Sequence, residues 1–328
     1  MKRAIAVLLA LVLALGLVSC AGKKAAGTDE GPTAMTVAFL KGPTGVGAAY
    51  LMEQCEQGVT GGYAITLEED PSAVTAAFIQ GSLAAAAVPT NVAAVLYNKM
   101  GGNVRIVAVN TLSVLHILEA GNTVHSVADL RGRTIYATGQ GANPEYVLNY
   151  ILRQNGLEPG ADVTVEYMDS GELTTRMAAG DADLCMLPVP AATTVLMKNP
   201  AVRDALSLGD EWAKTDAGSE LAQGCVVFHG DMEDLDARVE MFLKDYGESI
   251  AYMSDEKNRD EAAALAVKHG IIPSAEIAKA ALPDCGLVFL SGHDAVKDCV
   301  AGYLQVMFDA DPASVGGKLP DDDFYYGA

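Results

Sequence analysis

Two stretches of the chain share the same predicted order of helix, strand and helix, and they are the strongest indication of the fold. The first reads Phe78-Ile-Gln-Gly-Ser-Leu-Ala-Ala-Ala-Ala-Val-Pro89 and continues into an apolar run to Leu96. The second reads Met177-Ala-Ala-Gly-Asp-Ala-Asp-Leu-Cys-Met-Leu-Pro188 and continues to Leu196. In each stretch a helix ends at a glycine, which tolerates the left-handed conformation, and a short apolar strand follows. A proline, which has no N–H for the sheet, then ends the strand where a new helix begins.

This duplicated unit predicts two similar α/β lobes. A solute held between two lobes is a common design of binding proteins, and the duplication is consistent with it. The alternative is that any α/β protein repeats strand–helix units, so the duplication alone does not decide between a binding protein and another α/β protein.

The rest of the chain extends the same alternation of strands and helices. Further apolar strands are expected at 35–40, 65–68, 104–109, 115–119, 163–168 and 225–228, and the C-terminal third is mostly helical. This alternation predicts parallel, doubly wound sheets. We expect the first crossing between lobes at 110–113 and the return at the strand 225–228, so that residues 35–112 with 224–328 form lobe 1 and residues 113–223 form lobe 2.

The N-terminus carries the pattern of an export signal. Met1-Lys2-Arg3 is basic, an apolar segment follows, and Leu17-Val-Ser-Cys20 resembles a bacterial lipobox in which the Cys20 thiol is acylated. We therefore expect a lipoprotein signal peptide at 1–19, lipidation at Cys20 and a flexible tether at 20–34, which is small and polar. The alternative is an ordinary secretory signal with a chance cysteine. These features predict an exported protein anchored by lipid to the outer face of the cell membrane, or a periplasmic one.

Composition excludes one class of partner. The formal net charge is −20, and removal of the signal with Lys2 and Arg3 makes it −22. Such a charge argues against nucleic-acid binding, since phosphate backbones require a basic face. Half of the residues are hydrophobic, and the length suits two lobes better than one. We expect a monomer.

The cysteines outside the lipobox give no metal or redox motif. Cys55, Cys185, Cys225, Cys285 and Cys299 have no C-x-x-C spacing, and their odd number leaves at least one thiol unpaired. Cys185 and Cys225 lie in predicted apolar strands and are expected to be small core residues. Whether Cys285 pairs with Cys299 stays open.

Four loops are the candidate binding site, because ligands of open α/β sheets bind beyond the carboxyl ends of strands, at helix N-termini. They are 42–45, 89–91, 139–143 and 188–190, two from each lobe, and they carry neutral side chains with no acid, arginine or histidine. This favours a small polar or anionic solute. The predicted ligand-binding residues are Gly42, Pro43, Thr44, Gly45, Pro89, Thr90, Asn91, Thr111, Gln140, Gly141, Ala142, Asn143, Pro188 and Val189. For each glycine and proline, simple turn geometry is the competing explanation.

Catalytic and cofactor motifs are missing from the sequence. The run from Gly139 to Pro144 lacks the third glycine of a dinucleotide fingerprint, and the chain contains no P-loop, G-x-S-x-G or H-E-x-x-H pattern. We therefore expect no enzyme activity, no cofactor and no metal. His229 follows the return strand and is more simply a satisfied hinge histidine than a ligand contact. Trp212 is expected to pack on the lobe surface, and Asp321–Asp323 to form a solvated acidic tail rather than a cation site.

Several of these motifs occur together, and in order, in one known family. The lipobox, Gly42-Pro-Thr-Gly45, the turn 88–91, Asp129-Leu-Arg-Gly-Arg133, the loop 139–143 and the glycine-to-proline run 180–188 resemble the substrate-binding lipoproteins of ABC importers. The likeness is to the group that binds aliphatic sulfonates, nitrate and thiamine precursors, and it extends from about residue 35 to the C-terminus. The resemblance implies a type II periplasmic-binding-protein fold with two lobes and two crossover strands. It also implies partnership with an ABC permease and its ATPase, and closure of the lobes on a solute whose identity the sequence does not give. The cysteine-rich motif of the pyrimidine synthases in this superfamily is absent.

Two other functions stay open at this stage. One is an exported enzyme that acts on a small metabolite, although no acid–base pair is visible. The other is a lipoprotein that serves as a ligand-sensing domain or an adhesin.

Overall fold

The computed structural model describes residues 34–327. The predicted signal peptide, the lipidation site Cys20 and nearly all of the tether lie outside the described residues. None of the described helices combines the length and the apolar character needed to span a bilayer.

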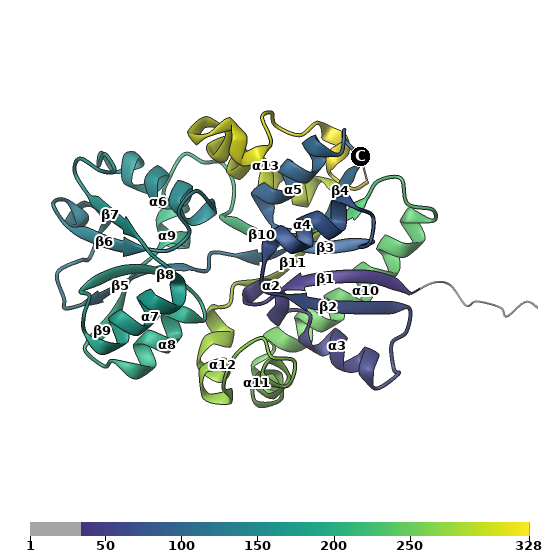
Figure 1. Cartoon of the computed structure of the whole chain (residues 1–328), viewed down its shortest axis with the longest axis horizontal. Helices are drawn as coiled ribbons and strands as arrows, with labels where there is room; N and C mark the ends of the chain where they lie inside the picture. Colours follow the sequence, from purple (N-terminus) through teal and green to yellow (C-terminus); the bar gives the residue numbers. More distant parts are fainter. Residues whose placement is uncertain (1–33, 328) are drawn as a thin grey trace, which may run out of the picture. The chain divides into compact units, whose positions relative to one another are not determined.

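Two separate β-sheets organise these residues, each with its own helices (Figure 1). The first sheet has the order β11-β4-β10-β3-β1-β2. Its strands are β1 (Met35–Leu40), β2 (Tyr63–Glu68), β3 (Ala85–Pro89), β4 (Val104–Leu112), β10 (Ala222–His229) and β11 (Leu287–Ser291). The second sheet has the order β7-β6-β8-β5-β9. Its strands are β5 (Leu115–Ala120), β6 (Thr134–Ala137), β7 (Thr164–Tyr167), β8 (Leu184–Pro188) and β9 (Val202–Ser207).

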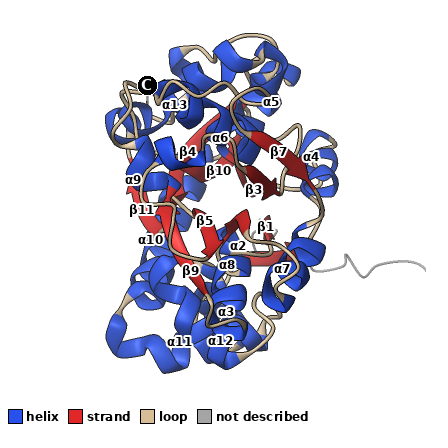
Figure 2. Ribbon diagram, turned by 90° about the vertical axis from the view of Figure 1, so that its left-hand side faces the viewer, coloured by secondary structure: helices blue, strands red, loops and turns tan. Residues whose placement is uncertain are grey.

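The helices α2 (Pro43–Val46), α3 (Ala49–Glu56), α4 (Pro71–Ile79), α5 (Thr90–Lys99), α10 (Leu235–Ser254), α11 (Arg259–Lys268), α12 (Ala275–Ala281) and α13 (His293–Ala310) accompany the first sheet. The helices α6 (Asn143–Gln154), α7 (Ser170–Ala179), α8 (Ala191–Lys198) and α9 (Leu208–Trp212) accompany the second. Helices cover both faces of each sheet (Figure 2). This explains why strands such as β3 and β8 are apolar along almost their whole length. We call each sheet with its helices lobe 1 and lobe 2.

The duplicated unit is confirmed in both lobes. It forms α4–β3–α5 in lobe 1 and α7–β8–α8 in lobe 2. Gly81 and Gly180, which follow the first helix of each unit, have φ of 75° and 83°. Pro89 and Pro188 are the last residues of the two strands. The type II periplasmic-binding-protein fold, with two lobes and two crossovers, is confirmed.

The sheets are mixed, and the prediction of purely parallel sheets was wrong. β1 pairs in parallel with β2 and β3, and β6 with β7 and β8, as in ordinary βαβ units. β5 and β10, however, run antiparallel to both of their neighbours. These two strands follow the crossovers, so they enter their sheet from the other lobe and not through a crossover helix of their own sheet.

The crossovers are short connections near the predicted positions. β4 extends to Leu112, and Ser113 with a φ of 55° leads to β5 at Leu115. The return segment follows α9, and β10 begins at Ala222. We propose the lobe limits predicted from the sequence, with residues 35–112 and 224–328 in lobe 1 and residues 113–223 in lobe 2.

The side chains of Asp321–Asp323 are exposed, as predicted, but the segment that carries them is packed against lobe 1 and is not a free tail. Asp323 accepts a hydrogen bond from the Tyr97 hydroxyl at 2.5 Å, and Asp322 pairs with Lys297 at 2.5 Å. Phe324 is fully buried. The apolar and tyrosyl side chains next to the acids therefore hold this segment in place, and its acids have specific partners.

Candidate functional site

Strand register places two of the predicted loops beside the first crossover. Pro89 pairs with Gly224, and Gly224 pairs with Thr111 on the other side of β10. In lobe 2, Pro188 pairs with Leu115. Since Thr111 and Leu115 are four residues apart, at most about 14 Å of chain separates them. The strand ends that carry Pro89 and Pro188 therefore lie on either side of the same connection.

Three polar side chains of lobe 1 converge on Gly224. A Cβ atom added there would lie 2.7 Å from Thr44 Cγ2, 2.7 Å from Asn110 Oδ1 and 3.0 Å from Thr111 Cβ. The Thr111 hydroxyl donates to Asn110 Oδ1 at 3.2 Å, and Thr44 donates to Leu40 O at 3.1 Å. The predicted residues Thr44 and Thr111 are thus brought together, with Asn110 and Gly224 as members that the sequence did not identify.

Thr90, the first residue of α5, is fully buried, and its hydroxyl oxygen has no hydrogen-bond partner. It lies close to the Cys225 thiol. Burial raises the pKa of that thiol to about 12. The sulfur itself is directed to Val88 O at 3.7 Å. A buried hydroxyl without a partner is costly, so this position is a candidate for contact with a bound molecule.

Asn143, the first residue of α6 in lobe 2, is 7% exposed. Its amide nitrogen donates to the hydroxyl of Tyr303 on α13, and its amide oxygen is buried without a partner. Tyr303 is fully buried, and burial together with the nearby Cys225 thiol raises the pKa of its hydroxyl. Tyr303 therefore lies near the Cys225–Thr90 contact of lobe 1 and also contacts the start of α6 in lobe 2.

An acidic residue in the first turn of α6 contacts the loop that precedes this helix. Glu145 Oε2 accepts a hydrogen bond from the Gly141 backbone N–H at 2.6 Å, so this predicted donor is already used. Gln140, Gly141 and Ala142 are exposed. The absence of acids in the loop sequence therefore did not exclude a carboxylate from the site, because the first turn of α6 supplies one.

Tyr167, at the carboxyl end of β7, is a further candidate that the sequence did not reveal. It pairs with Ala137, the last residue of β6, just before the predicted loop 139–143. Its hydroxyl oxygen is buried and has no partner. Burial and the charge of Glu145 raise the pKa of this hydroxyl.

The loop 188–190 contacts lobe 1 by apolar packing. Val189 is 2% exposed and belongs to a core cluster with Val46 and Ala49. Its N–H donates to Val114 O at 2.9 Å. The loop 42–45 lies beside this cluster, because it runs through α2 directly into Val46, which is a member of the cluster. Gly42, the residue before α2, has a φ of 101°. Gly45 approaches Leu40 O so closely that a Cβ would lie 2.5 Å from it.

Asn91 makes a structural contact. It is the second residue of α5, and Pro89, the residue before that helix, provides no side-chain cap. The Asn91 amide donates to Ser314 O at 3.1 Å, which joins α5 to the C-terminal segment. Its role in ligand binding stays a prediction.

His229 and Trp212 both have partners within the protein. His229 ends β10 opposite Val104, the first residue of β4, and so lies at the sheet edge away from Pro89 and the crossovers. Its Nε2 is 2.9 Å from Phe78 O, and its ring stacks on Phe78. The interpretation as a satisfied histidine agrees with this, but its expected place near the hinge was wrong. Trp212 is 1% exposed and donates to Ser219 O.

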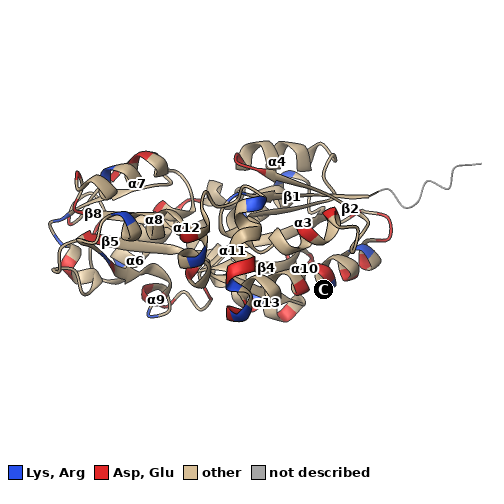
Figure 3. Cartoon of the chain, turned by 90° about the horizontal axis from the view of Figure 1, so that it is seen from below, with Lys and Arg blue, Asp and Glu red and all other residues tan. Residues whose placement is uncertain are grey.

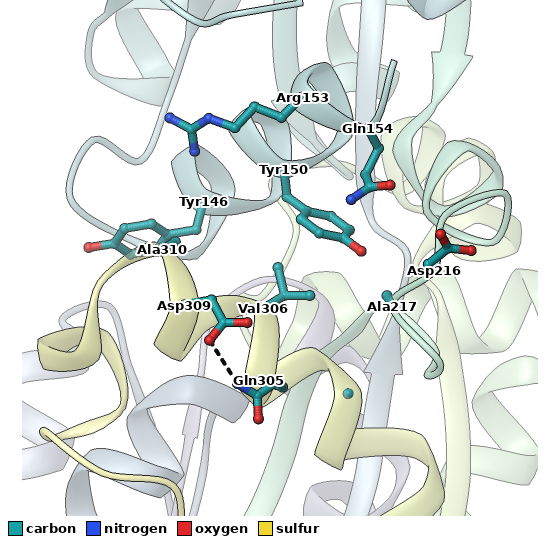
Figure 4. Close-up of a pocket in the computed structure, with 11 residues that line it drawn as sticks. Tyr146, Tyr150, Arg153, Gln154, Asp216, Ala217, Gln305, Val306, Asp309 and Ala310 are labelled. Atoms are coloured by element: carbon teal, nitrogen blue, oxygen red, sulfur yellow. Dashed lines mark hydrogen bonds between the residues drawn. The ribbon is translucent and has the colours of Figure 1, made fainter. Parts of the chain in front are cut away.

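A cavity of about 440 Å³ lies between α6, the return segment and α13 (Figure 4). Tyr150 and Gln154 extend toward it from α6, and Asp216 and Val306 line it from the other side. None of the predicted ligand-binding residues lines this cavity. It lies where α6 of lobe 2 contacts α13 of lobe 1.

The fold agrees with the comparisons to known proteins. Residues 63–207 match the family described as NMT1/THI5 like. The chain also has the fold of solved binding proteins. An ABC transporter structure from Parabacteroides distasonis is 22% identical with a TM-score of 0.74 and covers 89% of this chain and 98% of its own. The periplasmic aliphatic sulphonate binding protein of Escherichia coli is 18% identical with a TM-score of 0.69, covering 90% and 91%.

A third neighbour extends the agreement. The alkanesulfonate-binding protein of Xanthomonas axonopodis pv. citri, bound to MOPS, is 15% identical with a TM-score of 0.64, covering 90% of this chain and 98% of its own. Curated protein sequences give no match. The resemblance predicted from the motifs, to the substrate-binding proteins of ABC importers for sulfonates and related solutes, is thus confirmed at the level of the fold.

Charge in this binding-protein fold is dispersed. In the view of Figure 3, Lys and Arg are scattered among the acidic residues and gather on no single element. The candidate site offers hydroxyl and amide groups from Thr44, Thr90, Asn110, Thr111 and Asn143, which can orient a polar solute by hydrogen bonds.

Proposed function

We propose that this chain is the solute-binding lipoprotein of an ABC importer. In this proposal Cys20 carries the lipid anchor, the chain acts as a monomer, and the solute is a small polar molecule bound between the lobes. The delivery partners are an ABC permease and its ATPase. The fold shared with importer binding proteins supports this proposal.

One observation carries the proposal. Thr90 Oγ1 at the start of α5 and Asn143 Oδ1 at the start of α6 are both buried and both without a partner. One comes from lobe 1 and the other from lobe 2, and both belong to loops predicted to bind the solute. A polar solute that contacts both oxygens would satisfy two groups that the protein leaves unpaired.

The same pair gives the proposed mechanism. A solute that contacts Thr90 in lobe 1 and Asn143 in lobe 2 makes both contacts only when the lobes are closed. Binding therefore shifts the population toward the closed state, which the permease recognises. Lipidation at Cys20 would keep the protein at the membrane surface and raise its concentration near the permease.

The test is a thermal-shift screen of the purified chain against sulfonates, nitrate, pyrimidines and small carboxylates, followed by the variant Thr90→Val. We expect one compound to raise Tm. Because the Thr90 hydroxyl has no partner, Thr90→Val should leave the stability without solute unchanged or up to about 1 kcal/mol higher. It should weaken solute binding about tenfold.

Thr164→Val, at an exposed threonine of β7, is the matched control and should bind like the parent. Equal affinity of the parent and Thr90→Val would show that the site lies elsewhere. A chain that binds no compound of the panel but turns one over would be an enzyme.

A further inference from the structure

A second candidate site lies on lobe 1, at the contact of α3 with α11, and involves none of the predicted ligand-binding residues. Glu53 and Glu56 are three residues apart near the end of α3, so they share one face of that helix. His269 directly follows α11. One ligand atom from each of these three residues can be chosen so that all lie within 4.8 Å of one another. Figure 1 shows α3 and α11 next to each other below the first sheet.

The histidine is the informative member of this cluster. The His269 side chain is 3% exposed, and its Nε2 atom is buried without a hydrogen-bond partner. Nε2 lies 3.5 Å from Glu53 Oε2. The ligand atoms of a tetrahedral Zn²⁺ site, each about 2.0–2.1 Å from the metal, lie roughly 3.4 Å apart. The spacing of Nε2 and the Glu53 carboxylate is therefore close to that of two ligands of one metal ion.

The two carboxylates already attract a cation. Lys268 Nζ contacts Glu53 and lies 2.8 Å from Glu56 Oε2. Its side chain is 48% exposed, so the ammonium group can leave without opening the core. Glu56 Oε1 lies 3.6 Å from Nδ1 of the His269 ring, and because the Glu56 side chain is 54% exposed its carboxylate can turn toward Nε2. The Gln57 amide donates to Glu53 Oε1 at 2.6 Å and orients that carboxylate from behind.

We propose that Glu53, Glu56 and His269 form a binding site for a divalent transition metal ion such as Zn²⁺, with Lys268 as the competing cation. Two carboxylates and one neutral imidazole are ligands that Zn²⁺ accepts, and water completes the coordination. The ion pairs of this cluster place the His269 ring between the two glutamates, with Nε2 3.5 Å from Glu53 Oε2 and Nδ1 3.6 Å from Glu56 Oε1, but they give the buried Nε2 atom no hydrogen bond. A bound ion would link α3 to α11.

The test is calorimetric titration of the purified chain with ZnCl₂. His269→Phe keeps a buried ring and should weaken Zn²⁺ binding tenfold or more. Glu56→Gln, at an exposed position that should not disturb folding, should weaken it by a similar factor. Lys268→Met removes the competing ammonium and should strengthen binding about tenfold. The tighter Zn²⁺ binding of Lys268→Met is the most discriminating result, since an ion-pair network without a metal site does not predict it.

His125→Gln, at an exposed histidine of lobe 2, is the control and should bind like the parent. Metal held elsewhere on the chain contributes equally to every variant, so only the differences are interpreted. Equal affinity of the parent, His269→Phe and Glu56→Gln would overturn the proposal, as would a Lys268→Met variant that binds Zn²⁺ no more tightly than the parent.

Discussion

The Asn143 amide nitrogen donates a hydrogen bond to the Tyr303 hydroxyl, which joins the first residue of α6 in lobe 2 to α13 in lobe 1. Both side chains are buried. The Tyr303 ring lies 5.9 Å from that of Trp212, which in turn lies 5.1 Å from Tyr150. A second hydrogen bond joins α6 to the end of α13, because the Tyr146 hydroxyl donates to Asp311 at 3.2 Å. The lobes are thus joined by specific polar contacts in addition to the two crossovers.

Tyr303→Phe tests the first of these contacts. The substitution keeps the ring but leaves both polar atoms of the buried Asn143 amide without a partner. We expect it to lower the free energy of unfolding by about 1–3 kcal/mol, measured by urea denaturation. Tyr150→Phe is the control, because the Tyr150 hydroxyl makes no hydrogen bond to the described residues. Equal midpoints for the two variants would show that the Asn143 bond adds no stability.

Gly224→Ala tests the packing of the candidate site in lobe 1. The new methyl group would lie 2.7 Å from both Thr44 Cγ2 and Asn110 Oδ1, so these side chains have to move. We expect a loss of about 1–3 kcal/mol in urea denaturation and at least tenfold weaker binding of any solute found in the screen. Gly61→Ala is the matched control, because a Cβ atom there meets open space. Solute affinity equal to that of the parent would place the binding site away from Gly224.

The sequence predicted the features that local signals determine. Gly81 and Gly180 take left-handed conformations after helices, and Pro89 and Pro188 end strands, because the conformational limits of these two residue types act within a few residues. The same signals placed Thr90 and Asn143 at helix starts. The order of the motifs was sufficient to indicate the fold.

Features that depend on distant parts of the chain could not be predicted. β9, Val202-Arg-Asp-Ala-Leu-Ser207, was missed because charged residues interrupt its apolar pattern and its place is set by pairing with β5. β11 does carry an apolar run, Leu287-Val-Phe-Leu290, but its place at the sheet edge is set by pairing with β4. The partner of Asn143 lies 160 residues away on a helix whose sequence reads as ordinary core. Cys285 and Cys299 are both free thiols, which only their positions in the fold reveal.

Glu119 carries a prediction about acid stability. Its side chain is 1% exposed and pairs with Arg203 at 2.6 Å. It also accepts backbone hydrogen bonds from Thr123 at 3.0 Å and Val124 at 3.1 Å. Burial acts to raise the pKa of this carboxyl group, but the hydrogen bonds from Thr123, Val124 and Arg203 outweigh it and lower the pKa to about 2. Glu119 is therefore a carboxylate whose charge stabilises the folded chain.

The direction of the pH effect follows from these values. Because the pKa is about 2 in the folded chain and 4.5 as the ordinary value, the stabilisation is present above about pH 5 and is lost as the pH falls toward 2. Glu119→Gln should therefore cost about 2–3 kcal/mol at pH 7, measured by urea denaturation, and roughly half as much at pH 3. Glu166→Gln, at an exposed glutamate of β7, should match the parent at both pH values. A difference between the parent and Glu119→Gln that is the same at pH 7 and pH 3 would contradict the prediction, because the loss would then come from packing and not from the charge.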